Sequence, residues 1–381
     1  MSEGSRNPVA RASPGSGRRR PPPASRTGRV RFAAAVLFLL LPAAAAAAAE
    51  LGPLPPPPAN PDNPATEAKA ELGRLLFFDR RLSGDGTMNC ATCHDPETGY
   101  GDGLPISQSY PTTKNWRNAP PLVNVAYRQS LFWDGRAATL EEQALFPVMS
   151  PFEMNRNLDL LEEELRSVPG YVEAFREVFG GEVSRERVAM ALAAFQRTIV
   201  SRETPLDRYL LGDREALTPL QKRGLEVFSG KGRCAACHDG PALSDGKFHA
   251  LGVPEDPDVT GDPRVAATRR FVAKTAGYPE YRELSEDLGR FLVTKDPRDR
   301  KAFLTPMLRE VASTGPYMHN GAFRTLREVI EFFDRGGGAG NGGSPLLEPL
   351  RLTAQEKEAL EAFLAGALSG PVPRVRPPKL P

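Results

Sequence analysis

All four cysteines of the 381-residue chain lie in two copies of one five-residue motif. Cys90-Ala91-Thr92-Cys93-His94 and Cys234-Ala235-Ala236-Cys237-His238 both read C-x-x-C-H, the attachment sequence for c-type haem. Two thiols at this spacing can form thioethers with the two vinyl groups of a haem, and the next histidine then lies under the iron as its proximal ligand. The motifs therefore predict two covalently bound haems, with four attachment cysteines and with His94 and His238 as iron ligands.

Zinc and disulfides explain the two motifs less well. The two C-x-x-C pairs of a zinc ribbon are about 15–20 residues apart, whereas Cys90 and Cys234 are 144 positions apart. A thioredoxin-like redox pair needs one motif and no histidine after it. A disulfide between cysteines so near in sequence would constrain almost no chain. Haem attachment is the interpretation that uses every cysteine.

Residues 1–49 have the order of regions found in a secretory signal. Eight arginines occur in the first 31 residues, an apolar run extends from Phe32 to Leu41, and an alanine tract ends near Ala49. We expect cleavage near Ala49, and the alternative is an anchor helix retained over residues 32–49. Either arrangement places the folded part outside the cytoplasm, where covalent haem attachment takes place in bacteria. The sequence thus predicts a periplasmic protein.

The charge balance gives no sign of a nucleic-acid partner. The whole chain has 49 basic and 47 acidic residues, a net charge of +2. Residues 1–49 hold eight arginines and one acid, so the remainder has a net charge of −5. The excess of positive charge therefore belongs to the N-terminal segment and does not indicate binding to nucleic acid or to a membrane surface.

Helical periodicity and loop-forming residues alternate along the chain. The pattern predicts few or no strands, and helices over residues 70–77, 158–179, 188–199, 219–228, 326–333 and 355–368. Residues 99–132 are rich in Gly, Pro, Asn and Ser and predict loops around a cofactor, and residues 252–299 also have the pattern of a loop. We therefore predict a mostly α protein with two tandem cytochrome-c-like haem domains.

The expected segments follow from the same patterns. They are a signal peptide over 1–49, a solvated proline-rich linker over 50–65, an N-terminal haem domain over 66–212, a C-terminal haem domain over 213–370 and a tail over 371–381. The boundary after residue 212 rests on Pro205, Gly212 and Pro219, which interrupt helical periodicity there.

The chain also resembles the bacterial di-haem cytochrome c peroxidases and their relatives of the MauG type. The resemblance covers residues 72–368 and rests on blocks that occur in the family's order: GRLLFFD at 73–79, RNAPP at 117–121, FWDGR at 132–136, EM at 153–154 and GPYMHNG at 315–321. It implies an N-terminal haem that reacts with hydrogen peroxide and a C-terminal haem that transfers electrons. A small soluble donor, such as a cytochrome c or a cupredoxin, would supply those electrons.

The same resemblance assigns roles to individual side chains. Glu153 matches the distal glutamate, which would carry a proton from one peroxide oxygen to the other. Trp133 matches the tryptophan between the two haems, which would relay electrons. Asp134 and Arg136 would support the loop of Trp133 or bind propionates. The alternatives to these roles are a solvated loop carboxylate for Glu153 and core packing for Trp133.

A calcium ion and a dimer are further implications of the resemblance. Family members hold Ca²⁺ between their domains, and Asn118, Thr314 and Pro316 fall on the ligand positions. Family members are often dimers, although no interface is readable in this sequence.

Two positions depart from the family pattern. In many members a loop histidine blocks the peroxide-reacting haem, but the corresponding residue here is Tyr110, and no histidine lies between His94 and His238. We therefore expect an open iron at the N-terminal haem, unless Tyr110 or Met149 binds it.

The second departure is at the C-terminal haem, where the family's methionine or tyrosine ligand is replaced by Phe333. Phenylalanine cannot bind iron, so either this haem is open too or one of four other side chains replaces the ligand: Met307, Met318, His249 or His319. Three functions stay in view: a peroxidase, a MauG-type oxidase of a partner protein, and an electron-transfer cytochrome without enzymatic activity.

Overall fold

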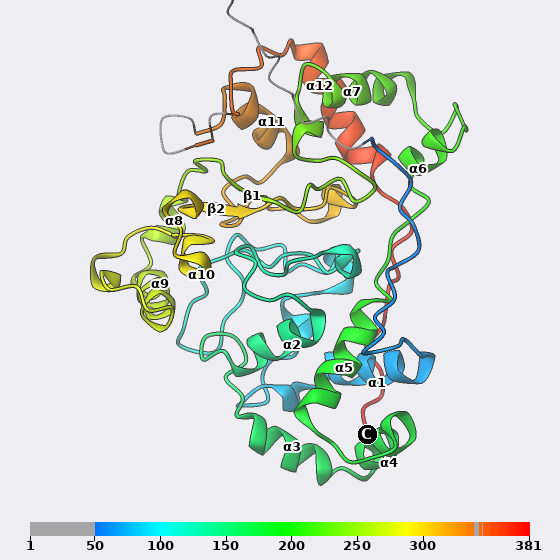
Figure 1. Ribbon diagram of the computed structural model, residues 1–381, viewed down its shortest axis with the longest axis vertical. Coiled ribbons are helices and arrows are strands. Elements are labelled where there is room, and N and C mark those ends of the chain that lie inside the picture. The colour runs from blue at the N-terminus through cyan, green and yellow to red at the C-terminus, as the bar shows by residue number, and fades with distance from the viewer. Residues whose placement is uncertain (1–49, 339–342, 345) are drawn as a thin grey trace, which may run out of the picture. The chain divides into compact units, whose positions relative to one another are not determined.

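Short helices joined by long loops make up the fold, and Figure 1 shows their order along the chain. The computed structural model describes residues 50–338, 343–344 and 346–381, so the predicted signal peptide lies outside the described residues. Among these residues, no helix is both long enough and apolar enough to cross a membrane. The helices are α1 (Glu67–Phe78), α2 (Leu140–Met149), α3 (Leu158–Arg166), α4 (Pro169–Phe179), α5 (Arg185–Gln196), α6 (Pro205–Leu210), α7 (Pro219–Ser229), α8 (Pro257–Thr260), α9 (Pro263–Thr275), α10 (Phe291–Thr294), α11 (Leu326–Asp334) and α12 (Ala354–Ala362).

One close helix crossing organises the N-terminal half. Gly73 in α1 faces α5 so closely that a Cβ atom there would lie 1.9 Å from the carbonyl oxygen of Ala191. One turn further on, the rings of Phe77 and Phe195 pack with their centroids 5.0 Å apart. Glycine is required because only a residue without a side chain lets the two helix backbones approach this closely.

The C-terminal half repeats the crossing with different helices. A Cβ atom on Gly224 in α7 would lie 2.0 Å from the carbonyl oxygen of Ala359 in α12. The next turn pairs Phe228 with Phe363, with ring centroids 5.3 Å apart. Each crossing lies in its own hydrophobic core, one built from buried residues between 72 and 199 and the other from buried residues between 206 and 368. The prediction of two tandem cytochrome-c-like domains is confirmed.

A tight loop followed by a threonine-capped helix also occurs once in each half. Leu131 bridges to Ala137 and Tyr317 bridges to Phe323, and each bridge closes a tight loop. A threonine then caps the following helix in both halves, Thr139 for α2 and Thr325 for α11. The two loops and helices are therefore equivalent by position. Trp133 in the first loop corresponds to His319 in the second, and Pro147 in α2 corresponds to Phe333 in α11, because each is the eighth residue of its helix.

The first described segment contacts both halves of the protein, and the C-terminal tail packs on the N-terminal half. In the segment that was predicted to be a solvated linker, Leu54 and Asn63 are buried, so the prediction is wrong at these residues. The backbone N–H of Leu54 donates to the carboxylate of Asp207 at 3.2 Å. The tail places Val372 and Val375 against the N-terminal core, and it ends near α4 (Figure 1).

Residues 252–299 are not the plain loop that their glycines and prolines predict. They contain α8, α9 and α10. These helices lie between β1 (Phe248–Ala250) and β2 (Ala302–Leu304), which pair antiparallel with His249 opposite Phe303. Asp262 caps α9 and Pro263 begins it, which is a regular helix start. At the proposed domain boundary, Leu206 of α6 already belongs to the C-terminal core, although the predicted boundary lies after residue 212.

Candidate functional site

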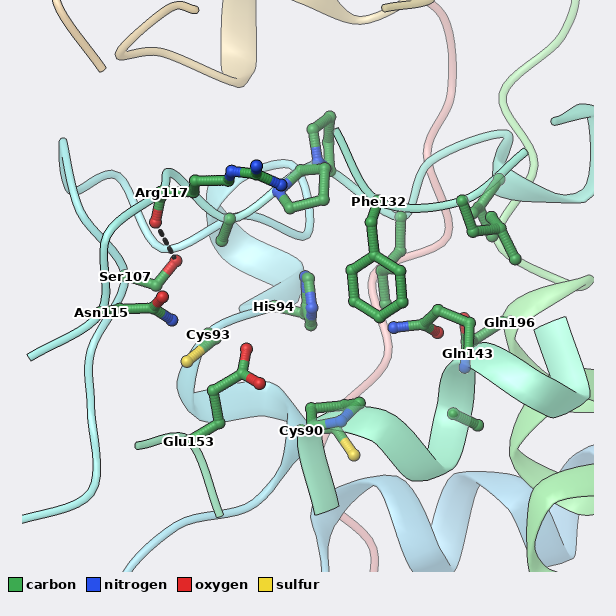
Figure 2. A pocket seen from close by; sticks show the side chains of 18 of the residues that line it. Cys90, Cys93, His94, Ser107, Asn115, Arg117, Phe132, Gln143, Glu153 and Gln196 are labelled. Atoms are coloured by element: carbon green, nitrogen blue, oxygen red, sulfur yellow. Dashed lines mark hydrogen bonds between the residues drawn. The ribbon is translucent and has the colours of Figure 1, made fainter. Parts of the chain in front are cut away.

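The first C-x-x-C-H motif lines a cavity in the N-terminal half, shown in Figure 2. The side chain of Asn89 caps the turn at Cys90 and also donates from Nδ2 to the carbonyl of Phe78 at 2.7 Å, which ties the motif to α1. His94 Nδ1 lies 3.1 Å from the carbonyl oxygen of Tyr100. A carbonyl can only accept, so Nδ1 carries the proton and Nε2 keeps its lone pair for a metal.

The second motif has the same arrangement in the C-terminal half. His238 Nδ1 lies 3.0 Å from the carbonyl oxygen of Leu243, which again leaves Nε2 free to bind a metal. His238 lines a second cavity together with Cys234 and Cys237. The pKa of both proximal histidines is lowered by burial, to about 4 for His94, so both imidazoles are neutral, as metal ligands must be.

The donors of both cavities fit a c-type haem. All four cysteines are free thiols with no disulfide between them. Each pair stands at the edge of a cavity with largely apolar walls, including Phe132, Leu131 and Leu192 in the first and Phe303 and Leu347 in the second. Thiols at the vinyl spacing, one free imidazole nitrogen and an apolar slot are the three requirements of covalent haem binding.

Glu153 lies in the first cavity, on the loop that follows α2. Its carboxylate points into the space beside Cys93 and His94 (Figure 2). The loop is held by the N–H of Gly84, which donates to the carbonyl of Met154 at 2.8 Å. A Cβ atom on Gly84 would lie 2.3 Å from the carbonyl oxygen of Asn155, so a glycine is needed for this close approach.

Trp133 is the one described residue that lines both cavities. Its indole Nε1 donates to the carbonyl oxygen of Asn118 at 2.9 Å, and its own carbonyl accepts from the N–H of Leu304 at 2.8 Å. The first contact fixes the ring, and the second joins the loop to β2 in the C-terminal half. The side chain therefore lies where a relay between two cofactors would have to lie.

Comparison with known proteins identifies the family of this chain. Residues 67–215 match the family model described as di-haem cytochrome c peroxidase. A cytochrome-c peroxidase, IdrP1, of Pseudomonas sp. (strain SCT) is 46% identical over 335 residues, covering 87% of this chain and 88% of the relative. The chain belongs to the di-haem cytochrome c peroxidase family. Its members are oxidoreductases, so an electron carrier without enzymatic activity is not the function that the comparisons support.

Other relatives of this peroxidase family show its second branch. The methylamine utilization protein MauG of Methylorubrum extorquens is 38% identical over 323 residues, covering 84% of this chain and 83% of the relative. A crystal structure of a MauG-like protein associated with microbial copper homeostasis has a TM-score of 0.70 at 33% identity, covering 83% of this chain and 93% of the other. The chain is thus similar both to named peroxidases and to MauG.

A buried ion-pair network supports the loop of Trp133 in this member of the family. Arg117 donates from Nη1 to Asp134 at 2.7 Å and from Nε to Asp287 at 2.6 Å. Arg136 donates to the other oxygen of Asp134 at 2.9 Å. Asp134 and Arg136 therefore stabilise the loop of Trp133, which is the first of the two roles predicted for them; the second was binding to propionates. Arg117 was not predicted, because its bridge joins residues 170 positions apart in sequence.

The side chains proposed to block the N-terminal iron lie elsewhere. Neither Tyr110 nor Met149 lines the first cavity, and Met149 is 45% exposed. Among the described lining residues, His94 is the only histidine, and no tyrosine occurs. Gln143 does line this cavity and was missed. It lies one helical turn before Pro147 on the same face of α2, so helical periodicity could have identified it.

Phe333 lines the second cavity, together with Met318, His319 and His249 of the proposed substitute ligands. Met307 is buried and does not line it. His249 lies beside the second C-x-x-C-H motif and already has a partner. Its Nε2 lies 2.8 Å from a carboxylate oxygen of Asp245, close to Cys237. The ring of His319 stacks on Phe303 with centroids 3.6 Å apart.

The predicted calcium ligands are brought together only in part. The N–H of Asn118 donates to the carbonyl oxygen of His319 at 2.8 Å, and Asn118 Nδ2 donates to the carbonyl oxygen of Leu104 at 2.6 Å. These bonds place Asn118 beside the segment that contains Thr314 and Pro316 and leave its side-chain oxygen as an acceptor. Calcium binding by these three residues stays a prediction.

Proposed function

We propose that this protein is a periplasmic di-haem peroxidase that reduces hydrogen peroxide to water with electrons from a small redox protein. The observation that carries the proposal is the position of Glu153, whose carboxylate enters the cavity lined by His94. The overall reaction takes one peroxide, two protons and two electrons and yields two waters. When bound by the two C-x-x-C-H motifs, the haems would supply the iron and the redox chemistry of this reaction.

Glu153 performs the proton transfer in this proposal. As a carboxylate it accepts a proton from the first peroxide oxygen, and it then donates that proton to the second oxygen, which leaves as water. The apolar walls formed by Phe132 and Leu131 limit competing water around this group. Gln143, on the facing helix α2, has an amide that can hydrogen-bond the incoming peroxide.

Trp133 would relay electrons between the two haem cavities, from the C-terminal one to the N-terminal one. The support for this role is that its indole lines both cavities and is held at Nε1. A small cytochrome c or a cupredoxin would deliver one electron at a time at the C-terminal half. The net charge of −5 outside residues 1–49 favours a donor with a basic docking face.

One experiment tests this function directly. The holoprotein is mixed with reduced cytochrome c and hydrogen peroxide, and the oxidation of the cytochrome is followed for wild type and for Glu153→Gln. We expect the variant to keep both haems and to turn over roughly 10²–10⁴ times more slowly. Glu163→Gln, an exposed substitution on α3, is the matched control. An unchanged rate in Glu153→Gln would remove this residue from the mechanism.

A second candidate is a MauG-type oxidase that uses peroxide to oxidise a partner protein. The observation that favours it is Phe333, because the second cavity offers no ligating side chain at the position of the family's methionine or tyrosine. Peroxide consumption that requires a protein partner and fails with reduced cytochrome c would favour this candidate over the first.

A further inference from the structure

Three arginines line the cavity of the N-terminal haem motif, and two of them are neutralised by the protein. Arg117 pairs with both Asp134 and Asp287, and Arg136 pairs with Asp134. These pairs use all the carboxylates that the network offers. The third arginine, Arg128, takes no part in them.

Arg128 is a partly buried cation for which the described residues provide no ion pair. Its Nε has no contact with solvent and no hydrogen bond, and no ion pair involves its guanidinium. Burial, with no compensating charge, lowers the pKa of this arginine to about 10. The residue as a whole is only partly buried, and because it lines the cavity, its accessible atoms face the space that a cofactor would fill.

A second group in the same cavity is also left without a partner. Gln196, at the end of α5, is 5% exposed, and its amide oxygen forms no hydrogen bond. Because the oxygen and nitrogen of an amide can be exchanged by a flip, this side chain can present either a donor or an acceptor. The polar lining of the cavity is therefore incomplete in the protein alone, and Arg128 has no counter-charge within it.

The chemistry of Arg128 defines the missing group. A guanidinium that is partly removed from solvent without a counter-charge is unfavourable, and its planar donors match a carboxylate in a bidentate geometry. We infer that Arg128 binds a carboxylate in this cavity and that the carboxylate is a propionate of the N-terminal haem. This inference rests on the haem loading assumed in the proposed function, and it adds a positioning role for Arg128 that the family resemblance did not assign.

A soluble small carboxylate is the other source of the same chemistry. The haem is favoured because it must occupy this cavity for Cys90, Cys93 and His94 to bind it, and its propionates are its only carboxylates. A propionate paired with Arg128 has its negative charge compensated. Without that compensation, the negative charge would stabilise the ferric state and lower the reduction potential.

The test is a spectroelectrochemical titration of the holoprotein, which resolves two midpoint potentials. In Arg128→Gln we expect one potential to fall and to become more dependent on pH near neutrality, while the other stays at its wild-type value. Arg128→Lys keeps the charge, so its potential should lie close to wild type at neutral pH and fall at alkaline pH as the ammonium group loses its proton. Arg185→Gln, a surface substitution that removes a paired arginine, should change neither potential.

Three results separate the alternatives. Unchanged potentials in Arg128→Gln would overturn the inference. A saturable spectral change on adding acetate to the wild type, absent from Arg128→Gln, would show that the site takes a soluble anion instead. If the glutamine variant does not assemble, the alkaline fall in Arg128→Lys decides the question by itself. None of these measurements uses peroxide, so failure here is distinct from failure of the proposed peroxidase activity.

Discussion

The hydroxyl of Tyr100 donates a 2.7 Å hydrogen bond to the carbonyl oxygen of Pro373, although the two residues are 273 positions apart. Tyr100 is fully buried, and its own carbonyl oxygen is the acceptor for Nδ1 of His94. The C-terminal tail is therefore one hydrogen bond away from the residue that orients the proximal histidine of the N-terminal haem. A segment that the sequence pattern marks as a tail supports the site in the other half of the chain.

Removal of the hydroxyl of Tyr100 should destabilise the protein. Tyr100→Phe removes the hydrogen bond to Pro373, an exposed residue whose carbonyl water can then solvate, so the expected loss is about 0.5–1.5 kcal/mol. Urea unfolding of the holoprotein, followed by far-UV circular dichroism, measures the loss. Tyr209→Phe is the matched control, because Tyr209 is only partly buried and no hydrogen bond of its hydroxyl is observed. Equal stability of the two variants would contradict the support role of the tail.

The loop of Glu153 should be displaced by a side chain at residue 84. In Gly84→Ala the new Cβ atom would clash with the carbonyl oxygen of Asn155, so the loop must move. We expect peroxide turnover to fall at least ten-fold with both haems retained, because a misplaced acid–base group loses much of its effect. Gly52→Ala, whose Cβ atom would make an ordinary 3.5 Å contact, is the control and should turn over as wild type does.

Loss of Arg117 should destabilise the protein strongly. Arg117→Met leaves Asp134 and Asp287 buried without their main counter-charge, and breaking a buried pair of this kind costs about 3–5 kcal/mol. Thermal and urea unfolding at neutral pH measure the change. Arg264→Gln is the control, because it breaks an exposed pair with Asp262, and pairs of that kind contribute little. A small effect of Arg117→Met would mean that the network is not a main support of the loop of Trp133.

The same network predicts that the stabilities of the wild type and of Arg117→Met change in opposite directions with pH. Burial alone would raise the pKa of Asp134 and Asp287, but the charge of Arg117 outweighs it and holds both below their usual range. The wild type therefore has this contribution to stability at pH values above about 4 and loses it as pH falls further. In Arg117→Met, Asp134 keeps its pair with Arg136, but Asp287 loses its arginine and burial should raise its pKa, so the variant should gain stability on acidification from neutral pH towards 4. Urea midpoints measured across this range give the sign.

Phe333 predicts an open iron at the C-terminal haem. In the resting ferric protein we expect electron paramagnetic resonance to show high-spin signals from both haems, with haem content quantified in parallel. Phe333→Met should convert one of the two signals to low spin, because methionine can bind iron from the same position. A low-spin signal already present in the wild type would instead indicate a substitute ligand, and Met318→Leu and His319→Ala would identify it.

Calcium binding can be tested by metal analysis of the purified holoprotein. We expect one calcium ion per chain, lost in Asn118→Leu, because hard oxygen ligands are what Ca²⁺ requires. Removal by a chelator should also weaken the support that Asn118 gives to the indole of Trp133. Absence of calcium from the wild type would remove Asn118, Thr314 and Pro316 from the list of metal ligands.

The chemistry of this protein could be predicted from the sequence because it depends on residues that are adjacent in the chain. The C-x-x-C-H motifs need only one turn of backbone to place two thiols and an imidazole. Helix α9 could also have been predicted, since Asp262 and Pro263 form a regular helix start. The glycines and prolines on either side of it led to the prediction of a loop instead. The linker prediction failed at Leu54, because burial depends on a partner that lies far away in the chain.

The sequence alone determined the mostly helical class and the family, and it predicts which residues bind the haems. Only the tertiary structure decided which side chains share a cavity: Glu153 with His94, Trp133 with both motifs, and Arg128 without a counter-charge. The physical reason is that attachment motifs act through local geometry, whereas neutralisation of a buried charge depends on groups up to 170 residues away, as the bond between Arg117 and Asp287 shows. The spacing of residues in the sequence does not predict such a contact.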